Sequence, residues 1–524
     1  MESNMTWERE IAEIAKRKEL AQARGGPEGV ERQRRRGKLL VNERVDGLLD
    51  PGTLTEFMSL VGRPKYDDAG ELVAFTPKGA IEGFGKVNGR KVVVSAGDFT
   101  VRGGSGGGDG SDGLGSEKRS NQRALEWRVP YVRMLDAAGG SVRGFETLGR
   151  TYLPDGNMWS TIDTDLLRTV PVVSAVMGSV AGLPAVNACM AHFTIMVKGI
   201  SQLFPGGPPV VKAALGYDVT KEDLGDERIH VHQSGSVDNL AEDEDDAFRQ
   251  IRQFLNYLPQ SVYEMPERAE PTDDPNRREE RLRRLVPRDR RRAYDGHRAI
   301  NWCVDEGSFF EIAPFYGRSR ITGLARINGY PVGVMANNPM HEGGSTDVKG
   351  GSKVIRLLQL CDTFHLPLIS FADEPGFMVG VESEKQGIER AGARLVMATC
   401  QSRMPWATVV MGRLFGVAGQ CQHRPTGMFQ RWAWPSGRWG SMHIEGGALA
   451  AYRREIDTAD DPEAKRAEIE QRLQDLASPF RTAEATGQDI IDPADTRPLL
   501  CEFVEDAQPI LRTQLGPSPY PYMP

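Results

Sequence analysis

The chain has 524 residues, of which 39% are hydrophobic and 26% are charged, proportions typical of soluble globular proteins. This length exceeds what one hydrophobic core usually supports, so two domains are expected. The net charge of −7 excludes the strongly basic surface typical of nucleic-acid-binding proteins. No nucleic acid partner is therefore expected.

The cysteines and the apolar stretches bear on the compartment. Six cysteines are scattered without a CxxC pair, which indicates buried thiols in a reducing cytoplasm and no metal site. The first residues are not an apolar run, so no secretion signal is expected. Residues 169–197 lack charged side chains and are long enough to span a membrane. Because Pro171, Gly178 and Pro184 interrupt them, we interpret them as a buried strand, a turn and a helix, and expect no membrane association.

The predicted elements begin with a charged helix over residues 5–23 and a basic run over residues 31–38. The basic run is compatible with an anionic ligand, but an exposed helix face is the more common structure for such a pattern. Residues 79–98 are two β-branched runs joined at Asn88-Gly89, a strong hairpin signal. A second hairpin is predicted over residues 320–339, joined at Asn328-Gly329, with an offset of 240 positions.

Other motifs repeat with similar spacing. The sequence RVPYVRMLDAAGG at residues 128–140 matches HLPLISFADEPGFMVG at residues 365–380 with an offset of 237 positions. TVPVVSAVMGSVAG at residues 169–182 matches RMPWATVVMGRLFG at residues 403–416 with an offset of 234 positions. Each half of the chain therefore predicts a hairpin, a strand, a glycine turn, a helix, a second strand, a second glycine turn and a helix. One long period indicates a duplicated domain rather than a solenoid.

The predicted domain boundaries follow from the distribution of charged residues along the chain. We predict an N-terminal domain over residues 1–262, a charged linker over residues 263–292 and a C-terminal domain over residues 293–524. The linker is predicted because EMPERAEPTDDPNRREERLRRLVPRDRRR is dense in charge and poor in apolar residues. A further charged helix is predicted over residues 462–476.

The glycine turns also indicate chemistry. A strand that ends in glycine-rich backbone before a helix leaves N–H groups that can hold an oxyanion. Such groups are expected at Gly139 and Gly140 in the first half and in the 416–419 turn of the second half. Close packing of helix against strand would also explain glycine at one such turn, but two equivalent turns favour an oxyanion site.

Several longer motifs are shared with a known family. They are RGKLLVNERVDGLLDPGTLTE (36–56), GDFTVRGGS (97–105), LFPGGPPVVKAALG (203–216), DLGDERIHVHQSG (223–235), LQLCDTFHLPLISFADEPGFMVG (358–380) and QGIERAGARLV (386–396). Together they make the chain resemble the carboxyltransferase (β) subunits of biotin-dependent acyl-CoA carboxylases, of the propionyl-CoA and methylcrotonyl-CoA type. The resemblance covers nearly the whole chain and implies an α/β fold of two duplicated crotonase-fold domains, each a ββα superhelix.

The resemblance also implies an activity and partners. Acyl-CoA would bind the first domain, and carboxybiotin from a separate biotin carboxylase or biotin carrier (α) subunit would bind the second. The carboxyl group would pass to the α or vinylogous carbon of the acyl-CoA through an enolate. A homohexamer is implied, with each active site between domains of two subunits. A biotin-dependent decarboxylase subunit running the reverse reaction, or a non-catalytic scaffold subunit, is the alternative.

By position, the resemblance assigns roles to single residues. Gly139 and Gly140 would hold the enolate oxygen, and Val417 and Ala418 would hold the ureido oxygen of biotin. The residues assigned to substrate binding are Gly104, Ser105, Gly182, Gly376, Phe377 and Gln420.

The chain departs from the family pattern near these positions. Val417 stands where propionyl-type members have glycine, and Ala137-Ala138 stands where Asp-Ser is usual. Val142 stands where arginine is often found. Alignment on Asp136 would move the glycine pair to residues 138–139. These departures affect the prediction of the acyl substrate more than the prediction of the reaction.

Other patterns are less specific. Residues 103–107 satisfy GxSxG, the motif of a hydrolase nucleophile, but a glycine-rich loop produces this match by chance. His341, Glu342 and Asp347 lack metal-ligand spacing on one element, so a polar loop is favoured over a metal site.

Two carboxylates and three tryptophans also have competing interpretations. Asp373 and Glu374 are candidates for acid–base catalysis, although a structural role at the strand end is favoured. Trp432, Trp434 and Trp439 could line an acyl or biotin pocket, but core or interface packing is the more common role.

Overall fold

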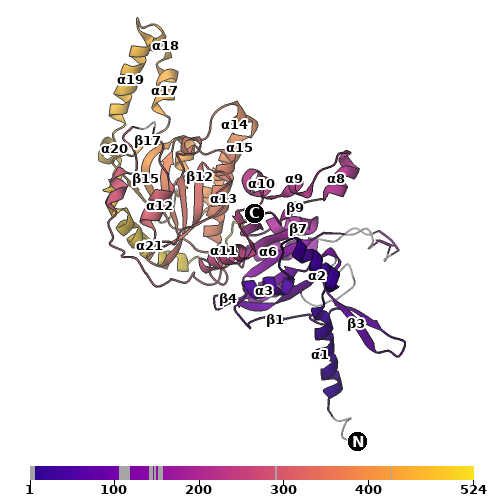
Figure 1. Ribbon diagram of the computed structural model, residues 1–524. Coiled ribbons are helices and arrows are strands. Elements are labelled where there is room, and N and C mark those ends of the chain that lie inside the picture. Colours follow the sequence, from indigo (N-terminus) through magenta and orange to yellow (C-terminus); the bar gives the residue numbers. More distant parts are fainter. Residues whose placement is uncertain are drawn as a thin grey trace. The chain divides into compact units, whose positions relative to one another are not determined.

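The computed structural model describes residues 6–104, 119–140, 145–146, 149–151, 157–289, 292–424 and 426–524. The chain forms two compact units, of which unit 1 ends at Asn256 and unit 2 spans Tyr257–Met523. Within the described residues each unit contains an eight-stranded sheet with helices packed around it (Figure 1).

Unit 1 opens with helices and continues as a mixed sheet. Its strand order is β1 (Thr55–Glu56), β4 (Ala80–Val87), β5 (Arg90–Gly97), β6 (Tyr131–Ala137), β7 (Val172–Ala181), β8 (Phe193–Val197) and β10 (Asn239–Ala241), with β9 (Gln202–Phe204) paired to β7. A separate ribbon pairs β2 (Gly62–Tyr66) with β3 (Leu72–Pro77). The helices are α1 (Glu8–Gln22), α2 (Gly26–Arg35), α3 (Val41–Leu48), α4 (Ser120–Trp127), α6 (Asn157–Leu167), α7 (Leu183–Cys189), α8 (Pro208–Leu215), α9 (Lys221–Gly225), α10 (Glu227–Ile229) and α11 (Glu244–Asn256).

Unit 2 repeats this strand order. Its sheet runs β11 (Phe310–Glu311), β12 (Arg320–Ile327), β13 (Tyr330–Asn337), β14 (Leu368–Glu374), β15 (Trp406–Phe415), β16 (Phe429–Ala433) and β18 (Asp489–Ile490), with β17 (Arg438–Gly440) paired to β15. The helices are α12 (His297–Cys303), α13 (Val348–Thr363), α14 (Val381–Lys385), α15 (Ile388–Gln401), α16 (Gly416–Gln420), α17 (Ile444–Ala451), α18 (Arg453–Asp457), α19 (Pro462–Leu476), α20 (Pro479–Thr486) and α21 (Thr496–Arg512).

The strand registers confirm the predicted duplication. In both units an antiparallel hairpin, β4–β5 or β12–β13, is followed by parallel pairing to the next two strands. The pairing of β6 with β7 shifts between Leu135 and Ala137, and that of β14 with β15 shifts between Ala372 and Glu374. Even this local irregularity therefore recurs with the offset of 237 positions.

The two hairpins turn at the predicted Asn-Gly pairs, and an aspartate caps each turn. The carboxylate of Asp50 accepts hydrogen bonds from the backbone N–H groups of Asn88 (3.1 Å) and Gly89 (2.7 Å). Asp305 accepts the equivalent bonds in unit 2, at 3.0 and 2.8 Å. Asn88 has a φ of 52° and Gly89 a φ of 78°, the left-handed conformations of the type I′ turn that suits a two-residue hairpin.

The uncharged stretch at residues 169–197 is buried in the sheet of unit 1. It forms β7, the turn at Gly182 and α7, as predicted, and then adds β8 as a second strand. Every residue of β8 is buried. Across the described ranges, no helix combines the length and the apolar character needed to cross a membrane.

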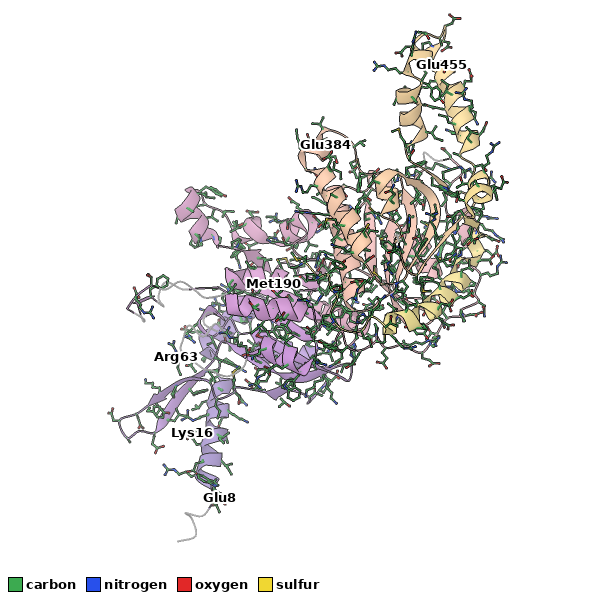
Figure 2. The ribbon with its side chains drawn as sticks, turned by 180° about the vertical axis from the view of Figure 1, so that it is seen from behind. Glu8, Lys16, Arg63, Met190, Glu384 and Glu455 are labelled. Atoms are coloured by element: carbon green, nitrogen blue, oxygen red, sulfur yellow. The ribbon has the colours of Figure 1, made fainter. Side chains whose placement is uncertain are left out.

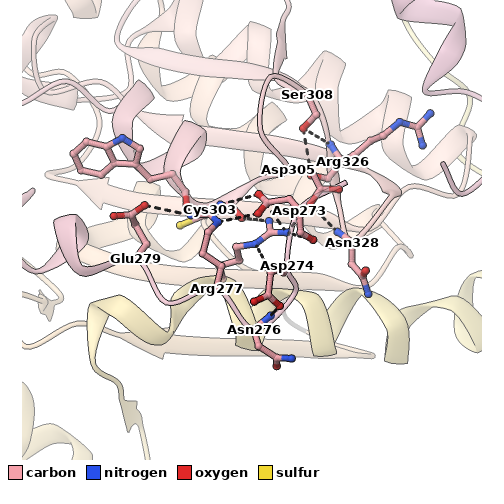
Figure 3. A network of polar contacts seen from close by, with 12 residues as sticks. Asp273, Asp274, Asn276, Arg277, Glu279, Cys303, Asp305, Ser308, Arg326 and Asn328 are labelled. Carbon is pink, nitrogen blue, oxygen red and sulfur yellow. Dashed lines mark hydrogen bonds and ion pairs between the residues drawn. The ribbon is translucent and has the colours of Figure 1, made fainter. Parts of the chain in front are cut away.

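The charged segment at residues 263–292 is fixed to unit 2 (Figure 3). Leu282, 1% exposed, belongs to the hydrophobic core of that unit. The fully buried Arg497 of α21 donates to the backbone carbonyl of Asp274 at 3.0 Å and to the carboxylate of Asp305 at 2.8 Å. The segment is therefore rich in charged residues and still anchored to the core, because the residues that it contacts lie elsewhere in the chain.

Helices α17 to α19 extend from unit 2 as a helical projection with a small core of its own. Ala448, Ile456 and Ile469 are buried within it, and Glu455 lies near its outer tip (Figure 2). The helix predicted over residues 462–476 is confirmed as α19.

His297, the first residue of α12, links that helix to β11 and gives unit 2 a pH-dependent contact. Its Nδ1 lies 2.7 Å from Asp295 and its Nε2 lies 3.0 Å from Glu311. The hydrogen bond and the charge of Glu311, followed by those of Asp295, raise the pKa of His297 to about 8 against the opposing effect of burial. Because the folded pKa exceeds the ordinary value near 6.5, the contact contributes stability that is fully present below about pH 6.5 and is lost as the pH rises through about 8.

We therefore expect the His297→Gln variant to lose part of the pH dependence of unfolding. The partly exposed site reduces the expected effect, so the free energy of unfolding of the unmodified chain should fall by about 1 kcal/mol more than that of the variant between pH 6 and pH 9. Urea denaturation at the two pH values measures this difference. His232→Gln, at an exposed histidine of unit 1, is the control, and equal pH dependence in all three proteins would contradict the assignment.

Candidate active site

The candidate site of unit 1 is built where β6 and β7 end side by side. β6 leads into the turn at Ala138-Gly139-Gly140, and β7 leads through Gly182 into α7. Gly139 has a φ of 80°, and a Cβ atom there would lie 2.6 Å from the carbonyl oxygen of Ala181. The two turns are therefore in direct contact, and glycine is required at residue 139 for both conformation and space.

The first turn carries backbone donors for which the described part of the chain offers no acceptor. The N–H of Ala138 donates to the carbonyl of Gly103 at 2.9 Å, whereas the N–H groups of Gly139 and Gly140 donate to no described residue. A Cβ atom at Gly140 would meet no atom within 4 Å. Close packing explains the glycine at 139 but not the one at 140, which borders open space in the described part of the chain.

Unit 2 presents the corresponding arrangement at the end of β15. This strand leads through Gly416, with a φ of 62°, into α16. Val417 and Ala418 occupy the first turn of α16, where backbone N–H groups have no acceptor within the helix. Ala418 is 1% exposed and the side chain of Val417 is 50% exposed. A Cβ atom at Gly419 would lie 3.0 Å from the backbone of Leu414, so α16 is held tightly against β15.

The duplication identifies a residue that the sequence motifs did not single out. The offset of 234 positions pairs Gly182 with Gly416, Leu183 with Val417, and Pro184 with Ala418. Gly139 has its counterpart in the turn after β14, at Gly376. The predicted pairs at 139–140 and 417–418 therefore belong to turns that are not equivalent. The turn equivalent to 416–418 supplies the N–H of Leu183 but no second donor, because Pro184 has no N–H.

The loop that precedes the first turn packs against β6. Gly104 has a φ of 69°, and a Cβ atom there would lie 2.6 Å from the carbonyl oxygen of Asp136, so the loop touches the end of the strand that bears the turn. Ser105, the remainder of the GxSxG motif and Val142 lie outside the described residues.

A buried ionic network supports the turns of unit 1. Asp136 is fully buried and accepts from Lys38 at 2.8 Å and from Arg44 at 3.1 Å, and Arg44 also donates to Glu244 at 2.6 Å. Burial lowers the pKa of Lys38, and the attraction of Asp136 opposes that shift. A Cβ atom at Gly178 would lie 2.1 Å from the Asp136 carboxylate, so β7 needs glycine there. The basic run is exposed up to Gly37 except at Gln33, as predicted for a solvated face, but Lys38 is 4% exposed.

Unit 2 has a related carboxylate at the end of β14. Asp373 accepts from Arg413 at 2.8 Å and from the hydroxyl of Tyr294 at 3.0 Å. Burial, followed by the charge of Asp373, raises the pKa of Tyr294 well above its ordinary value. Gly412 would place a Cβ atom 2.5 Å from this carboxylate, as Gly178 does in unit 1. Asp373 is 3% exposed and Glu374 is fully buried, which supports the structural role favoured from the sequence.

The remaining predicted residues of unit 2 lie near the same strand ends. β14 and β15 pair in parallel as far as Glu374 and Leu414, which brings the 376–377 turn beside the turn that follows β15. The ring of Phe377 packs against α15, because a Cβ atom at Gly392 would lie 3.0 Å from it. Gln420, the last residue of α16, is exposed.

Burial and capping describe the tryptophans and Asp347 more closely. Trp432 and Trp434 are 7% and 1% exposed and belong to the hydrophobic core, and Trp439 packs against a smaller cluster beside β15. Asp347 caps α13 by accepting from the N–H of Gly350 at 2.9 Å. No group of three potential metal ligands comes together among the residues that the structure describes.

Comparison with known proteins found a matching family model and several relatives. The carboxyl transferase domain model matches residues 32–508. The chain is 35% identical over 502 residues to the propionyl-CoA carboxylase, carboxyltransferase subunit of Haloferax mediterranei, covering 94% of this chain and 95% of that protein. It is 33% identical over 506 residues to the methylmalonyl-CoA carboxyltransferase 12S subunit of Propionibacterium freudenreichii subsp. shermanii, covering 95% and 94%. It is also 32% identical over 483 residues to the methylmalonyl-CoA decarboxylase subunit alpha of Veillonella parvula, covering 91% of each chain.

The fold agrees with a solved structure of the same kind. The transcarboxylase 12S crystal structure, described as a hexamer assembly with hydrolysed methylmalonyl-coenzyme A bound, superimposes with a TM-score of 0.85 at 32% identity and covers 96% of each chain. The two predicted crotonase-fold domains are thereby confirmed. The chain belongs to the carboxyl transferase domain family and is a carboxyltransferase enzyme subunit of the propionyl-CoA and methylmalonyl-CoA carboxylase type.

Proposed function

We propose that this subunit carboxylates an acyl-CoA with a carboxyl group delivered as carboxybiotin on a separate α subunit. It would do so in the cytoplasm, as the core of a homohexamer. The observation that carries the proposal is the presence, in each unit, of backbone N–H groups at the ends of the central parallel strands that find no acceptor among the described residues. The names of the relatives, which include a propionyl-CoA carboxylase and a hexameric transcarboxylase core, support the substrate class and the assembly.

Unit 1 would bind the acyl-CoA thioester. The N–H groups of Gly139, Gly140 and Leu183 would donate to the thioester oxygen as it gains negative charge during loss of the proton next to the carbonyl. Donors fixed in advance at the place where charge develops stabilise the transition state, and each is typically worth about 3 to 4 kcal/mol. The contact between the Gly139 turn and the Ala181 carbonyl holds the turns that bear these donors together.

Unit 2 would bind the biotin group. The N–H groups of Val417 and Ala418 would donate to the ureido oxygen, because they lie in the first turn of α16, where the helix offers no acceptor. When bound, carboxybiotin supplies the carboxyl group and the proton acceptor. Asp373 and Glu374 are engaged in buried hydrogen bonds, so they remain part of the support for this turn.

A reconstituted reaction tests the proposal. The purified chain, a biotinylated α subunit, ATP and labelled bicarbonate are incubated with a panel of acyl-CoAs. Label is expected to enter at least one acyl-CoA, and none should enter when the α subunit is omitted. Failure to label any thioester in the presence of an α subunit that carboxylates its own biotin would contradict the proposal.

The reverse direction is the second candidate, because a methylmalonyl-CoA decarboxylase subunit is among the relatives at 32% identity. The partner that co-purifies with the chain from its native source distinguishes the two directions. An ATP-dependent, biotin-carboxylating partner supports carboxylation, whereas a membrane partner that decarboxylates carboxybiotin without ATP supports the reverse reaction.

A further inference from the structure

A buried polar cluster lies beneath the ends of β14 and β15 in unit 2. Each of its side chains is at most 1% exposed, and the members are Arg320, Asn337, Thr346, Ser370, Glu374 and Gln422. We call it the Glu374 cluster. Its residues come from β12, β13, the segment before α13, β14 and the segment after α16.

The carboxylate of Glu374 is the common acceptor of the cluster. Its Oε2 atom accepts from Arg320 (2.9 Å), Asn337 (2.8 Å), the hydroxyl of Thr346 (2.5 Å) and Gln422 (3.1 Å). Its Oε1 atom accepts from the backbone N–H groups of Gly376 (3.1 Å) and Thr346 (3.3 Å). Glu374 therefore receives donors from side chains on one oxygen and from the backbone on the other.

These contacts reach both turns that end the central strands of unit 2. The bond to Gly376 fixes the turn after β14. Gln422, two residues beyond α16, receives hydrogen bonds on its side-chain oxygen from Ser370 (3.0 Å) and Arg320 (3.2 Å) and on its carbonyl from Thr408 of β15 (2.5 Å). The position of α16 is therefore set from its far end, through Gln422, by the same carboxylate.

Unit 1 shows that the fold does not require this cluster. At the positions equivalent to Arg320, Asn337, Glu374 and Gln422 it has Ala80, Gly97, Ala137 and Ala188. The strand order and the register shift are nevertheless the same in both units. Unit 1 buries its charges at other positions, such as Arg44 and Asp136. Among the described residues, this set of contacts around the ends of the central strands is therefore particular to unit 2.

We propose that Glu374 is a positioning residue that, through Gln422 and Gly376, fixes the turn carrying the N–H groups of Val417 and Ala418. It touches neither substrate. The inference rests on the proposed function of that turn, and it predicts that loss of the carboxylate impairs the biotin half of the site and spares the acyl-CoA half.

The Glu374→Gln variant tests this with almost no change in volume. In either orientation the new amide NH2 faces existing donors, those of Arg320 and its neighbours or the N–H groups of Gly376 and Thr346. We expect kcat/KM for the biotinylated α subunit to fall about 10- to 100-fold, the loss typical of a misplaced reacting group. KM for the acyl-CoA should stay within about twofold of the unmodified value, because unit 1 is untouched.

A second variant keeps the test decisive if Glu374→Gln does not fold. Gln422→Met keeps the volume and leaves the Glu374 and Arg320 charges paired. It removes the side-chain hydrogen bonds that join residue 422 to the cluster, so kcat/KM for the α subunit should fall in the same direction. Glu468→Gln makes the same chemical change as Glu374→Gln at an exposed position of α19 and should have no effect.

The outcomes separate the two proposals. An unmodified chain that is active beside a folded and equally active Glu374→Gln variant overturns the positioning role alone. If Glu374→Gln does not fold, an active Gln422→Met overturns it. Equal losses for the α subunit and the acyl-CoA also overturn it, since they indicate a merely structural role. An inactive unmodified chain overturns the proposed function and this inference with it.

Discussion

Replacing Ala418 with proline is expected to lower the rate of carboxyl transfer about 100- to 1000-fold, the loss typical of removing one oxyanion donor. Proline removes the N–H and adds only a small ring. It is tolerated in the first turn of a helix, where the N–H has no helical partner. Unit 1 provides a precedent, since Pro184 occupies the equivalent position at the start of α7. The fold should therefore survive, and kcat with saturating α subunit and acyl-CoA measures the effect.

The matched control keeps the donor. Ala418→Gly retains the N–H and should keep most of the activity. The circular dichroism spectra and thermal midpoints of both variants report whether the chain stays folded. A folded Ala418→Pro variant with more than about a third of the unmodified rate would show that this N–H holds no developing charge.

Loss of the Asp136 carboxylate is expected to be the most destabilising single change in unit 1. Asp136→Ala leaves Lys38 buried without its carboxylate and removes one of the two carboxylates that face Arg44. Breaking a buried ion pair by deleting one partner typically costs about 3 to 5 kcal/mol. Urea denaturation, followed by amide hydrogen exchange of peptides from unit 1, should show the transition of this unit at a clearly lower denaturant concentration.

The comparison for this variant is an aspartate on the surface. Asp223 pairs with Arg228 at 3.2 Å while both side chains are largely exposed, and exposed pairs contribute little to stability. Asp223→Ala should leave the transition of unit 1 where it is. A shift no larger in Asp136→Ala than in Asp223→Ala would mean that the buried network is not needed for the stability of unit 1.

Much of the fold was predictable because its signals are local. An Asn-Gly pair between β-branched runs specifies a tight hairpin through the conformations of two residues. Both hairpins accordingly form at Asn88-Gly89 and Asn328-Gly329. Repeated spacing then predicted the duplication without any knowledge of long-range contacts.

The supports of the site were harder to predict, because they join residues that are far apart in the chain. Lys38 meets Asp136 across 98 positions, and Glu374 meets Gln422 across 48. A single sequence gives no sign of such pairing, so the basic pattern of residues 31–38 predicts a solvated face that includes Lys38. The offset of 234 positions leads to Leu183, but an apolar side chain carries no functional signal when only its backbone N–H is relevant.

The most direct test of the account follows the carboxyl group itself. The chain is incubated, without ATP, with the biotinylated α subunit and a panel of acyl-CoAs labelled in a free carboxyl group, methylmalonyl-CoA among them. The account predicts that label moves from at least one thioester to biotin with the unmodified chain, and at least about 100-fold more slowly with Ala418→Pro. Label that stays on every thioester, or that moves equally fast with both proteins, would contradict it.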